Sequence, residues 1–149
     1  MNGASAPVSA IESVFRMRSE LAGAAGLFAW LEEALPADVA APETSARMHV
    51  ALEEAVVNAV MHGFPGGAVG EITVRLSVAD GAACLTIEDN GMAFDPTAAS
   101  EPARARSLSE AVPGGWGLAL IHKFCPTAAY ERKSEINRLT MRFALKTPA

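Results

Sequence analysis

The chain has 149 residues, of which 50% are hydrophobic and 19% are charged, and its formal net charge is −5. This length and composition predict one globular domain over residues 1–149 and exclude a disordered chain. The acidic balance argues against a broad basic surface for nucleic acid. The cysteines, Cys84 and Cys125, lack the spacing of a zinc site or a disulfide scaffold, and the longest apolar run is too short to span a bilayer. We expect a soluble, cytoplasmic protein without direct nucleic-acid or membrane contacts.

The first half of the chain predicts one strand and two helices. Residues 1–8 are small and polar and are expected to be disordered. Residues 11–18 alternate apolar and polar side chains, which predicts a half-buried strand at a sheet edge. Apolar stripes at helical spacing predict helices over 20–35 and from about Thr44 to His62, with Gly63 as a C-terminal glycine cap.

The second half predicts two hairpins separated by a long connection. Segments 71–79 and 82–88 flank Asp80-Gly81, which is a hairpin signal. Residues 95–113 lack periodicity, and a connection of that length is typical of a lid or of disorder. A short helix over 116–124 and a hairpin of 128–132 with 137–145 complete the chain. We therefore predict an α+β, two-layer sandwich whose helices cover one face of a mixed, mostly antiparallel sheet.

Three polar residues share one face of the second predicted helix. Glu54, Asn58 and His62 are spaced four residues apart, so a helix stacks them in register. Such a face is also what solubility requires of any amphipathic helix. A carboxylate, a carboxamide and an imidazole in this arrangement can instead hold a metal-bound phosphate and its attacking group.

A second polar motif follows the strand of residues 82–88. Asp89 and Gly91 stand where that strand ends, and an aspartate there can be an ordinary turn residue that bonds its own backbone. Alternatively, the Asp89 carboxylate accepts a hydrogen bond from an exocyclic amine such as that of adenine. Gly91 would then let the ring approach the backbone.

A third motif opens the predicted helix of residues 116–124. Gly114, Gly115 and Gly117 precede Leu118 and present bare backbone N–H groups at a helix start, which is a ready anion site. A flexible hinge with a helix cap would have the same glycine content.

The three motifs, taken in this order, resemble those of the GHKL, or histidine-kinase-like, ATPase superfamily. The first reads Glu-x-x-x-Asn-x-x-x-His, the second Asp-x-Gly-x-x-Phe and the third Gly-Gly-x-Gly-Leu-x-Leu. The chain has no room for the transducer domain of gyrase-like members, or for the dimerising helical hairpin of a histidine kinase. Its size, its order of elements and its ending NRLTMRF resemble the anti-sigma factor family of serine-protein kinases.

That resemblance implies ATP and Mg²⁺ as cofactors and assigns a role to each motif. Asn58 would be a ligand of Mg²⁺, and Glu54 would be the catalytic base. His62 would contact the phosphates or the metal shell, or would simply pack at the helix end. Asp89 and Gly91 would bind adenine, residues 95–113 would close over the nucleotide as a lid, and the phosphates would be held by Gly114, Gly115, Gly117 and Leu118.

The same resemblance implies an enzyme of a partner-switching system. Members phosphorylate a serine or threonine of a STAS-domain anti-sigma factor antagonist, many sequester a sigma factor, and they are often homodimers. Two alternatives remain open from the sequence. The chain could be a non-catalytic, nucleotide-dependent anti-sigma module, or a detached histidine-kinase catalytic domain.

Overall fold

The structure, a computed structural model, describes residues 11–97, 121, 123 and 125–145. The described strands form one five-stranded sheet in the order β1-β2-β3-β5-β4. The strands are β1 (Ile11–Arg18), β2 (Glu71–Ala79), β3 (Ala82–Asp89), β4 (Ala129–Lys133) and β5 (Ile136–Ala144). The helical elements are η1 (Leu21–Gly26), α1 (Leu27–Ala34), α2 (Pro42–Gly63) and η2 (Pro65–Gly67).

Each pairing between the described strands is antiparallel. The prediction of a mostly antiparallel sheet is therefore confirmed, and no parallel pair occurs among these five strands. The edge position expected for residues 11–18 is also correct, because β1 pairs only with β2 in this sheet. In the centre, the register places Asp89 at the end of β3 directly opposite Asn137 near the start of β5.

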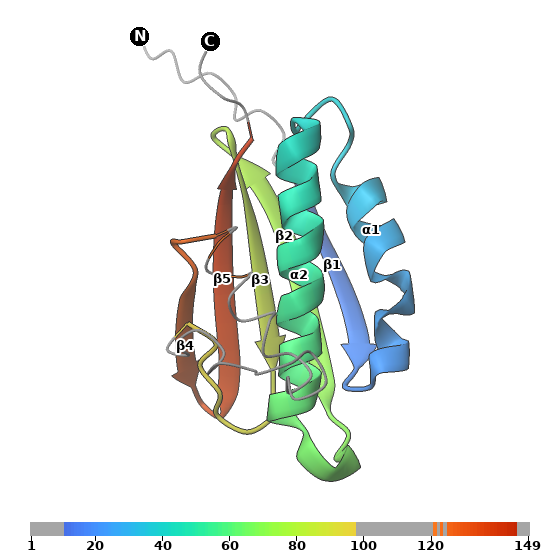
Figure 1. Cartoon of the computed structure of the whole chain (residues 1–149), viewed down its shortest axis with the longest axis vertical. Coiled ribbons are helices and arrows are strands. Elements are labelled where there is room, and N and C mark those ends of the chain that lie inside the picture. Colours follow the sequence, from blue (N-terminus) through green and yellow to red (C-terminus); the bar gives the residue numbers. More distant parts are fainter. Residues whose placement is uncertain (1–10, 98–120, 122, 124, 146–149) are drawn as a thin grey trace, which may run out of the picture.

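Helices α1 and α2 cover one face of the sheet, with α2 running along β2 and β3 and α1 beside it over β1 (Figure 1). Alternate residues of the strands point toward the helices and are buried, as in β2, where every second side chain is inaccessible. The most deeply buried apolar side chains come from both layers: Leu31, Met48, Leu52, Ile72, Leu76, Leu85 and Met141. The predicted two-layer α+β sandwich is confirmed.

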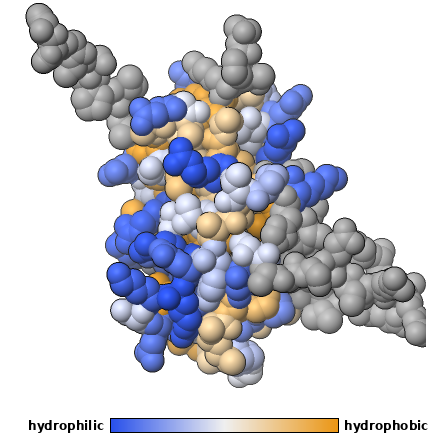
Figure 2. Space-filling model, turned by 90° about the vertical axis from the view of Figure 1, so that its left-hand side faces the viewer, coloured by the Kyte–Doolittle hydropathy of each residue, from blue (hydrophilic) through white to orange (hydrophobic). Residues whose placement is uncertain are grey.

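The opposite face of the sheet is polar and carries a chain of ion pairs. The Glu88 carboxylate accepts hydrogen bonds from Arg75 at 3.0 Å and Arg138 at 2.8 Å, and Arg138 also reaches Glu131 at 3.1 Å. Figure 2, which views the molecule from the β4 side, shows hydrophilic residues gathered along the left of the view. Burial on one face only explains the strict alternation of β2 and β3.

The first predicted helix, over residues 20–35, is divided in two in the structure. A 3₁₀ segment, η1, precedes the α-helix α1. Gly23 and Gly26 lie in this region and disfavour a continuous α-helix. A side chain at Gly23 would meet the Arg18 carbonyl oxygen at 2.8 Å, so η1 packs directly against the end of β1.

The second helix begins at Pro42, two residues before the predicted start, because proline is well tolerated in the first turn. Its other end corrects a prediction. Gly63 lies inside α2 and does not have a positive φ, and the capping residue is Phe64 with φ −132°. Gly63 is therefore not a left-handed glycine cap, and its small size serves a close contact described below.

Both predicted hairpins are present, with left-handed residues in their turns. Asp80 and Gly81 have φ values of 52° and 74°, and Ser134 and Glu135 have values of 53° and 65°. The expected disorder of residues 1–8 concerns residues that are not described, as does most of the predicted lid over 95–113 and most of the helix over 116–124.

Candidate functional site

The polar face predicted on the second helix is present on α2, but its three members differ in environment. Asn58 is almost fully buried, with 1% of its surface exposed, whereas Glu54 and His62 are half-buried. Neither Nδ2 nor Oδ1 of Asn58 has a hydrogen-bond partner in the described part of the chain. Because nearly all buried amide groups in proteins are paired, a carboxamide left in this state is suited to a polar ligand.

Asp89 is the second predicted site residue, and the structure brings it to the same pocket as Asn58. Its Oδ1 atom accepts hydrogen bonds from the Gly91 amide at 2.9 Å and from Asn137 Nδ2 at 2.9 Å. The bond from Gly91 is the turn interaction that the sequence left open. Asp89 Oδ2 accepts no hydrogen bond from the residues described, so one oxygen serves the turn and the other is available to a ligand.

Asp89 is buried, with 7% of its surface exposed, and this affects its ionisation. Burial raises the pKa of the Asp89 carboxyl, whereas the hydrogen bonds from Asn137 and Gly91 and the charge of Arg132 act in the opposite direction. Burial has the larger effect, so the pKa of Asp89 is raised overall, while the three groups favour the charged form, which accepts a hydrogen bond from an amine.

Two glycines bring the end of α2 against the end of β3. A side chain on Gly91 would lie 2.5 Å from the Gly63 carbonyl oxygen, and one on Gly63 would lie 3.3 Å from Asp89 Oδ1. The Met92 amide donates to the Gly63 carbonyl at 2.8 Å. The hydrogen side chain of Gly91 admits the backbone of α2, and the predicted approach of a ligand ring to Gly91 stays a prediction.

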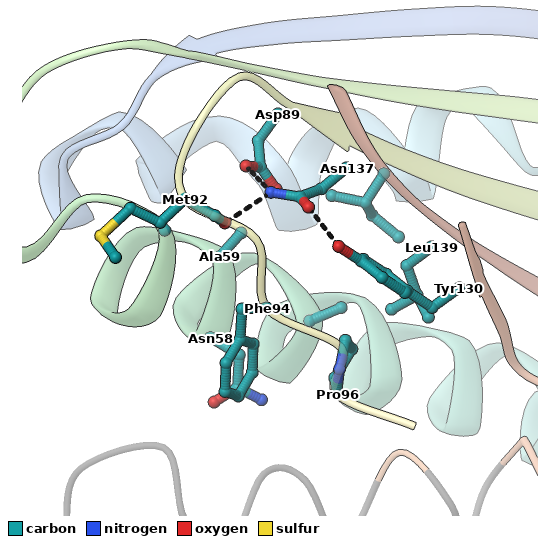
Figure 3. A pocket seen from close by; sticks show the side chains of 12 residues that line it. Asn58, Ala59, Asp89, Met92, Phe94, Pro96, Tyr130, Asn137 and Leu139 are labelled. Atoms are coloured by element: carbon teal, nitrogen blue, oxygen red, sulfur yellow. Dashed lines mark hydrogen bonds between the residues drawn. The ribbon is translucent and has the colours of Figure 1, made fainter. Parts of the chain in front are cut away.

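The pocket lies between α2, β4, the end of β3, the start of β5 and the segment that follows β3 (Figure 3). With the solvent at its open mouth included, the empty space between these walls is about 360 Å³. Its lining combines apolar walls with a few polar groups: Ala55, Asn58, Ala59, Gly63, Ile87, Asp89, Met92, Phe94, Pro96, Tyr130, Asn137 and Leu139. A flat aromatic ligand with a polar edge fits this combination.

Three polar residues near Asp89 were not predicted as part of the site. Asn137 lines the pocket, Tyr130 lines it from β4, and Arg132 donates to the Gly91 carbonyl at 3.0 Å. One signal in the sequence was available for Asn137. It occupies the first inward position of a strand whose other inward positions are Leu139, Met141 and Phe143, and an amide in such a series requires partners.

His62 packs against the segment that leaves β3. Its ring stacks on Phe94 with a centroid distance of 4.1 Å and an interplanar angle of 10°. Burial lowers the pKa of His62, which favours a neutral imidazole at neutral pH, and Nε2 is buried without a partner among the described residues. Of the two roles left open for His62, the packing role is observed, and the buried nitrogen leaves a contact with a ligand available.

Glu54 lies one helical turn before Asn58 and does not line the pocket. Burial and the charge of Glu53 both raise the pKa of Glu54, so its carboxylate is a stronger base than an ordinary glutamate. The remaining predicted site residues, Gly114, Gly115, Gly117 and Leu118, lie outside the described residues.

Two further properties concern the part of the chain that the structure describes. It contains no cluster of three or more histidine, cysteine, aspartate or glutamate side chains arranged to hold a metal ion. None of its helices has both the length and the apolar character needed to cross a membrane.

The chain matches the sequence profile of the histidine kinase-like ATPase domain over residues 17–143. The chain belongs to this family. It is 37% identical over 112 residues to the serine/threonine-protein kinase BtrW of Bordetella bronchiseptica, an alignment that covers 75% of this chain and 79% of that protein. The resemblance to GHKL ATPases of the anti-sigma factor kinase type is thereby confirmed.

A solved structure has the same histidine kinase-like fold. The structure of the RsbU and RsbW domains of Rv1364c from Mycobacterium tuberculosis superimposes with a TM-score of 0.65 over 93% of this chain, at 23% sequence identity. This chain spans about a third of that longer one, since it covers 33% of it. At this identity the likeness concerns the fold.

Proposed function

We propose that this protein binds Mg²⁺–ATP in the pocket between α2, the end of β3 and the start of β5, and transfers the γ-phosphoryl group to a serine or threonine of a STAS-domain anti-sigma factor antagonist. The observation that carries the proposal is the presence of Asn58 and Asp89 in one pocket, each with a polar group that has no partner among the described residues. Asp89 Oδ2 suits the exocyclic amine of adenine. Membership of an ATPase family supports the same ligand.

Among the described residues, we assign Asn58 as the ligand of Mg²⁺. Mg²⁺ prefers oxygen ligands and keeps several of its waters, so a single carboxamide oxygen together with phosphate oxygens is a sufficient set of anchors. Asn58 has no hydrogen-bond partner among the described residues, which fits this role, because a ligand would relieve the cost of a buried amide without partners. When bound, the ion would neutralise charge on the transferring phosphate.

Glu54 is the residue we assign as the base. The partner's hydroxyl oxygen forms a bond to the γ-phosphorus, the bond from that phosphorus to the β–γ bridging oxygen breaks, and ADP leaves. The hydroxyl proton passes to the Glu54 carboxylate and then to solvent. A raised pKa suits this task, since a base works best when its pKa approaches the working pH.

The assignment of the acceptor depends on the relatives. BtrW is named a serine/threonine-protein kinase, which supports a hydroxyl acceptor over a histidine. We extend the proposal to sequestration of a sigma factor in the cytoplasm, as the resemblance to anti-sigma factor kinases implies.

Phosphotransfer in a defined mixture tests the proposal. The full chain is incubated with γ-labelled ATP, Mg²⁺ and the STAS-domain protein encoded nearest to it, and the acid stability of any labelled product is measured. We expect an acid-stable label on the STAS protein and none with Glu54→Gln. Tight ATP binding without transfer would favour a non-catalytic anti-sigma module, and an acid-labile label would favour a histidine-kinase catalytic domain.

A further inference from the structure

Asn137 is a buried polar residue at the centre of a hydrogen-bond network that includes Asp89. It lies in register with Asp89 across the β3–β5 pair and has 4% of its surface exposed. Its Nδ2 atom donates to Asp89 Oδ1 at 2.9 Å and to the Met92 carbonyl at 2.8 Å. Figure 3 shows these bonds at one wall of the pocket.

The orientation of the Asn137 carboxamide is fixed by two donors on the neighbouring strand β4. The Arg132 guanidinium donates to Asn137 Oδ1 at 2.9 Å, and the Tyr130 hydroxyl donates to the same oxygen. A rotated amide would direct its NH₂ group at the Arg132 guanidinium, which can only donate, and would leave no donor for Asp89. Asn137 must therefore present its N–H groups to Asp89.

This network determines what Asp89 can offer a ligand. With Asn137 Nδ2 and the Gly91 amide both on Oδ1, a proton on that oxygen would displace a hydrogen bond. Oδ2 lacks a donor among the described residues, and Asp89 lines the pocket. The two hydrogen bonds to Oδ1 favour the ionised carboxylate. In that form Oδ2 matches the amine at C6 of adenine and opposes the carbonyl oxygen at C6 of guanine.

We propose that Asn137 is the positioning residue that makes this site selective for adenine over guanine nucleotides. It does so by orienting Asp89 and favouring its ionised form. Tyr130 acts through Asn137. Arg132 acts both through Asn137 and by its own charge beside Asp89. The inference rests on the proposed function, since it assumes that the pocket binds the base of ATP. It adds a determinant of base selectivity that lies on β4 and β5, outside the three sequence motifs.

The charges around Asp89 support this role. Among the neighbouring elements, β4 contributes Arg132, whose charge lowers the pKa of the Asp89 carboxyl, and Tyr130, which meets Asn137. Helix α2 contributes the uncharged Gly63 at this point. Arg138 of β5 pairs with Glu88 on the opposite face of the sheet. Without the hydrogen bond from Asn137, less would oppose the effect of burial, and the pKa of Asp89 would rise further. A protonated Asp89 is then favoured, and it can donate a hydrogen bond to a carbonyl.

The test compares the affinities of the full chain for Mg²⁺–ATP and Mg²⁺–GTP, measured by calorimetry at a series of pH values that starts about one unit above the ordinary carboxyl pKa. For Asn137→Leu we expect the ATP affinity to fall by about tenfold to a hundredfold, as for loss of a hydrogen bond to a charged group. The GTP affinity should change much less, so the ratio of ATP affinity to GTP affinity should fall.

Asn137→Asp supplies a readout that a merely structural role would not produce. Two carboxylates then face each other and repel at high pH, whereas at low pH they share a proton that replaces the lost N–H donor. We expect the ATP affinity of Asn137→Asp to recover as the pH falls, relative to wild type at each pH. Asn137→Leu should show no such recovery.

Asn90→Asp is the matched control, since it introduces the same charge next to Asp89. Asn90 Oδ1 accepts the Glu71 amide at 3.0 Å, and an aspartate can keep that bond. Because Asn90 is exposed, solvent screens the new charge, and this variant should keep an ATP-to-GTP affinity ratio much closer to wild type than Asn137→Asp does at each pH. If the Asn137 variants do not fold, the double variant Tyr130→Phe/Arg132→Met removes the two donors that orient Asn137, and its ATP-to-GTP ratio should also fall.

The outcomes separate the two proposals. If wild type binds ATP and the folded Asn137 variants, or the double variant in their place, keep its base discrimination and pH profile, the role of Asn137 is wrong and the proposed function stands. If wild type binds neither nucleotide, the proposed function is wrong and this inference falls with it.

Discussion

Gly91 lies so close to Gly63 that a side-chain carbon on Gly91 would be 2.5 Å from the Gly63 carbonyl oxygen. The same carbonyl accepts the Met92 amide at 2.8 Å, so the end of α2 and the exit from β3 are joined backbone to backbone. Asn58 and Asp89, which come from these two elements, line one pocket as a consequence. The distance between the two elements depends on the absence of a side chain at Gly91.

Gly91→Ala should therefore destabilise the protein and weaken nucleotide binding together. The new carbon must displace the backbone of Gly63, and such overpacking costs about 1–3 kcal/mol. Gly26→Ala is the control, because its new carbon would meet only the Phe15 ring at 3.5 Å, an ordinary contact. Urea unfolding of both variants measures the difference. Equal stability of Gly91→Ala and wild type would contradict the close contact.

Asn58 should limit the stability of the unliganded protein. Its buried amide has no hydrogen-bond partner in the described structure, and an unsatisfied buried group costs about 1–3 kcal/mol. Asn58→Leu is expected to raise the free energy of unfolding by an amount in this range and to abolish Mg²⁺–ATP binding.

Asn137→Leu is the matched comparison for Asn58→Leu, since it makes the same chemical change at an amide whose polar atoms are all paired. It should lower the free energy of unfolding. Thermal melts without nucleotide measure both variants. A loss of stability in Asn58→Leu similar to that in Asn137→Leu would show that the Asn58 amide has partners in the free protein.

These opposite expectations for two asparagines indicate where sequence reasoning succeeded and where it did not. Asn58 was found because its spacing from Glu54 and His62 is local, and a helix fixes which residues share its face. Asn137 was missed because its importance depends on the pairing of β5 with β3, which joins residues 48 positions apart. Strand alternation predicts which face a residue takes but not which residue lies opposite.

Gly63 illustrates the same limit within the fold. The alternation of β2 and β3 and the turn at Asp80-Gly81 were sufficient to predict that hairpin with nearly correct ends. A glycine that follows a helical stripe predicts a helix cap, because capping is the commonest local reason for a glycine there. The actual reason is the tertiary contact with Asp89 and Gly91, and only the packed structure contains it.

Glu54 and Glu53 should have separable effects on phosphotransfer. Glu54→Gln is expected to keep ATP binding and to reduce transfer by about 10²–10⁴-fold, the usual contribution of a general base. Transfer at the normal rate in this variant would show that Glu54 is not the base. The measurement is single-turnover transfer to the acceptor at saturating ATP.

Glu53→Gln tests the pH dependence of the same step. The negative charge of Glu53 contributes to the raised pKa of Glu54, so its removal should lower that pKa. The acidic limb of the rate profile, where Glu54 becomes protonated, should then move to lower pH, with the plateau rate retained. An acidic limb that stays in place, or moves to higher pH, would contradict the influence of Glu53 on Glu54.

Asp89→Asn should weaken ATP binding while making the unliganded protein more stable at neutral pH. In the variant, the side-chain oxygen can accept from Gly91 and Asn137 as before, and its NH₂ group then faces the pocket. That donor would meet the amine of adenine, also a donor, so the ATP affinity should fall by about tenfold or more. Equal ATP affinity in the variant and wild type would contradict the adenine contact.

The stability of wild type and Asp89→Asn should diverge as the pH rises. Because the folded protein raises the pKa of Asp89, the contribution of this carboxyl to folding is most favourable below its ordinary pKa and is lost as the pH rises through the raised value. The carboxamide of the variant does not titrate and loses nothing over this range. Urea unfolding at about pH 4 and about pH 7, near and well above the ordinary carboxyl pKa, should therefore reveal a stability advantage of the variant that is larger at the higher pH. An advantage that shrinks as the pH rises would mean that the folded protein lowers the pKa of Asp89.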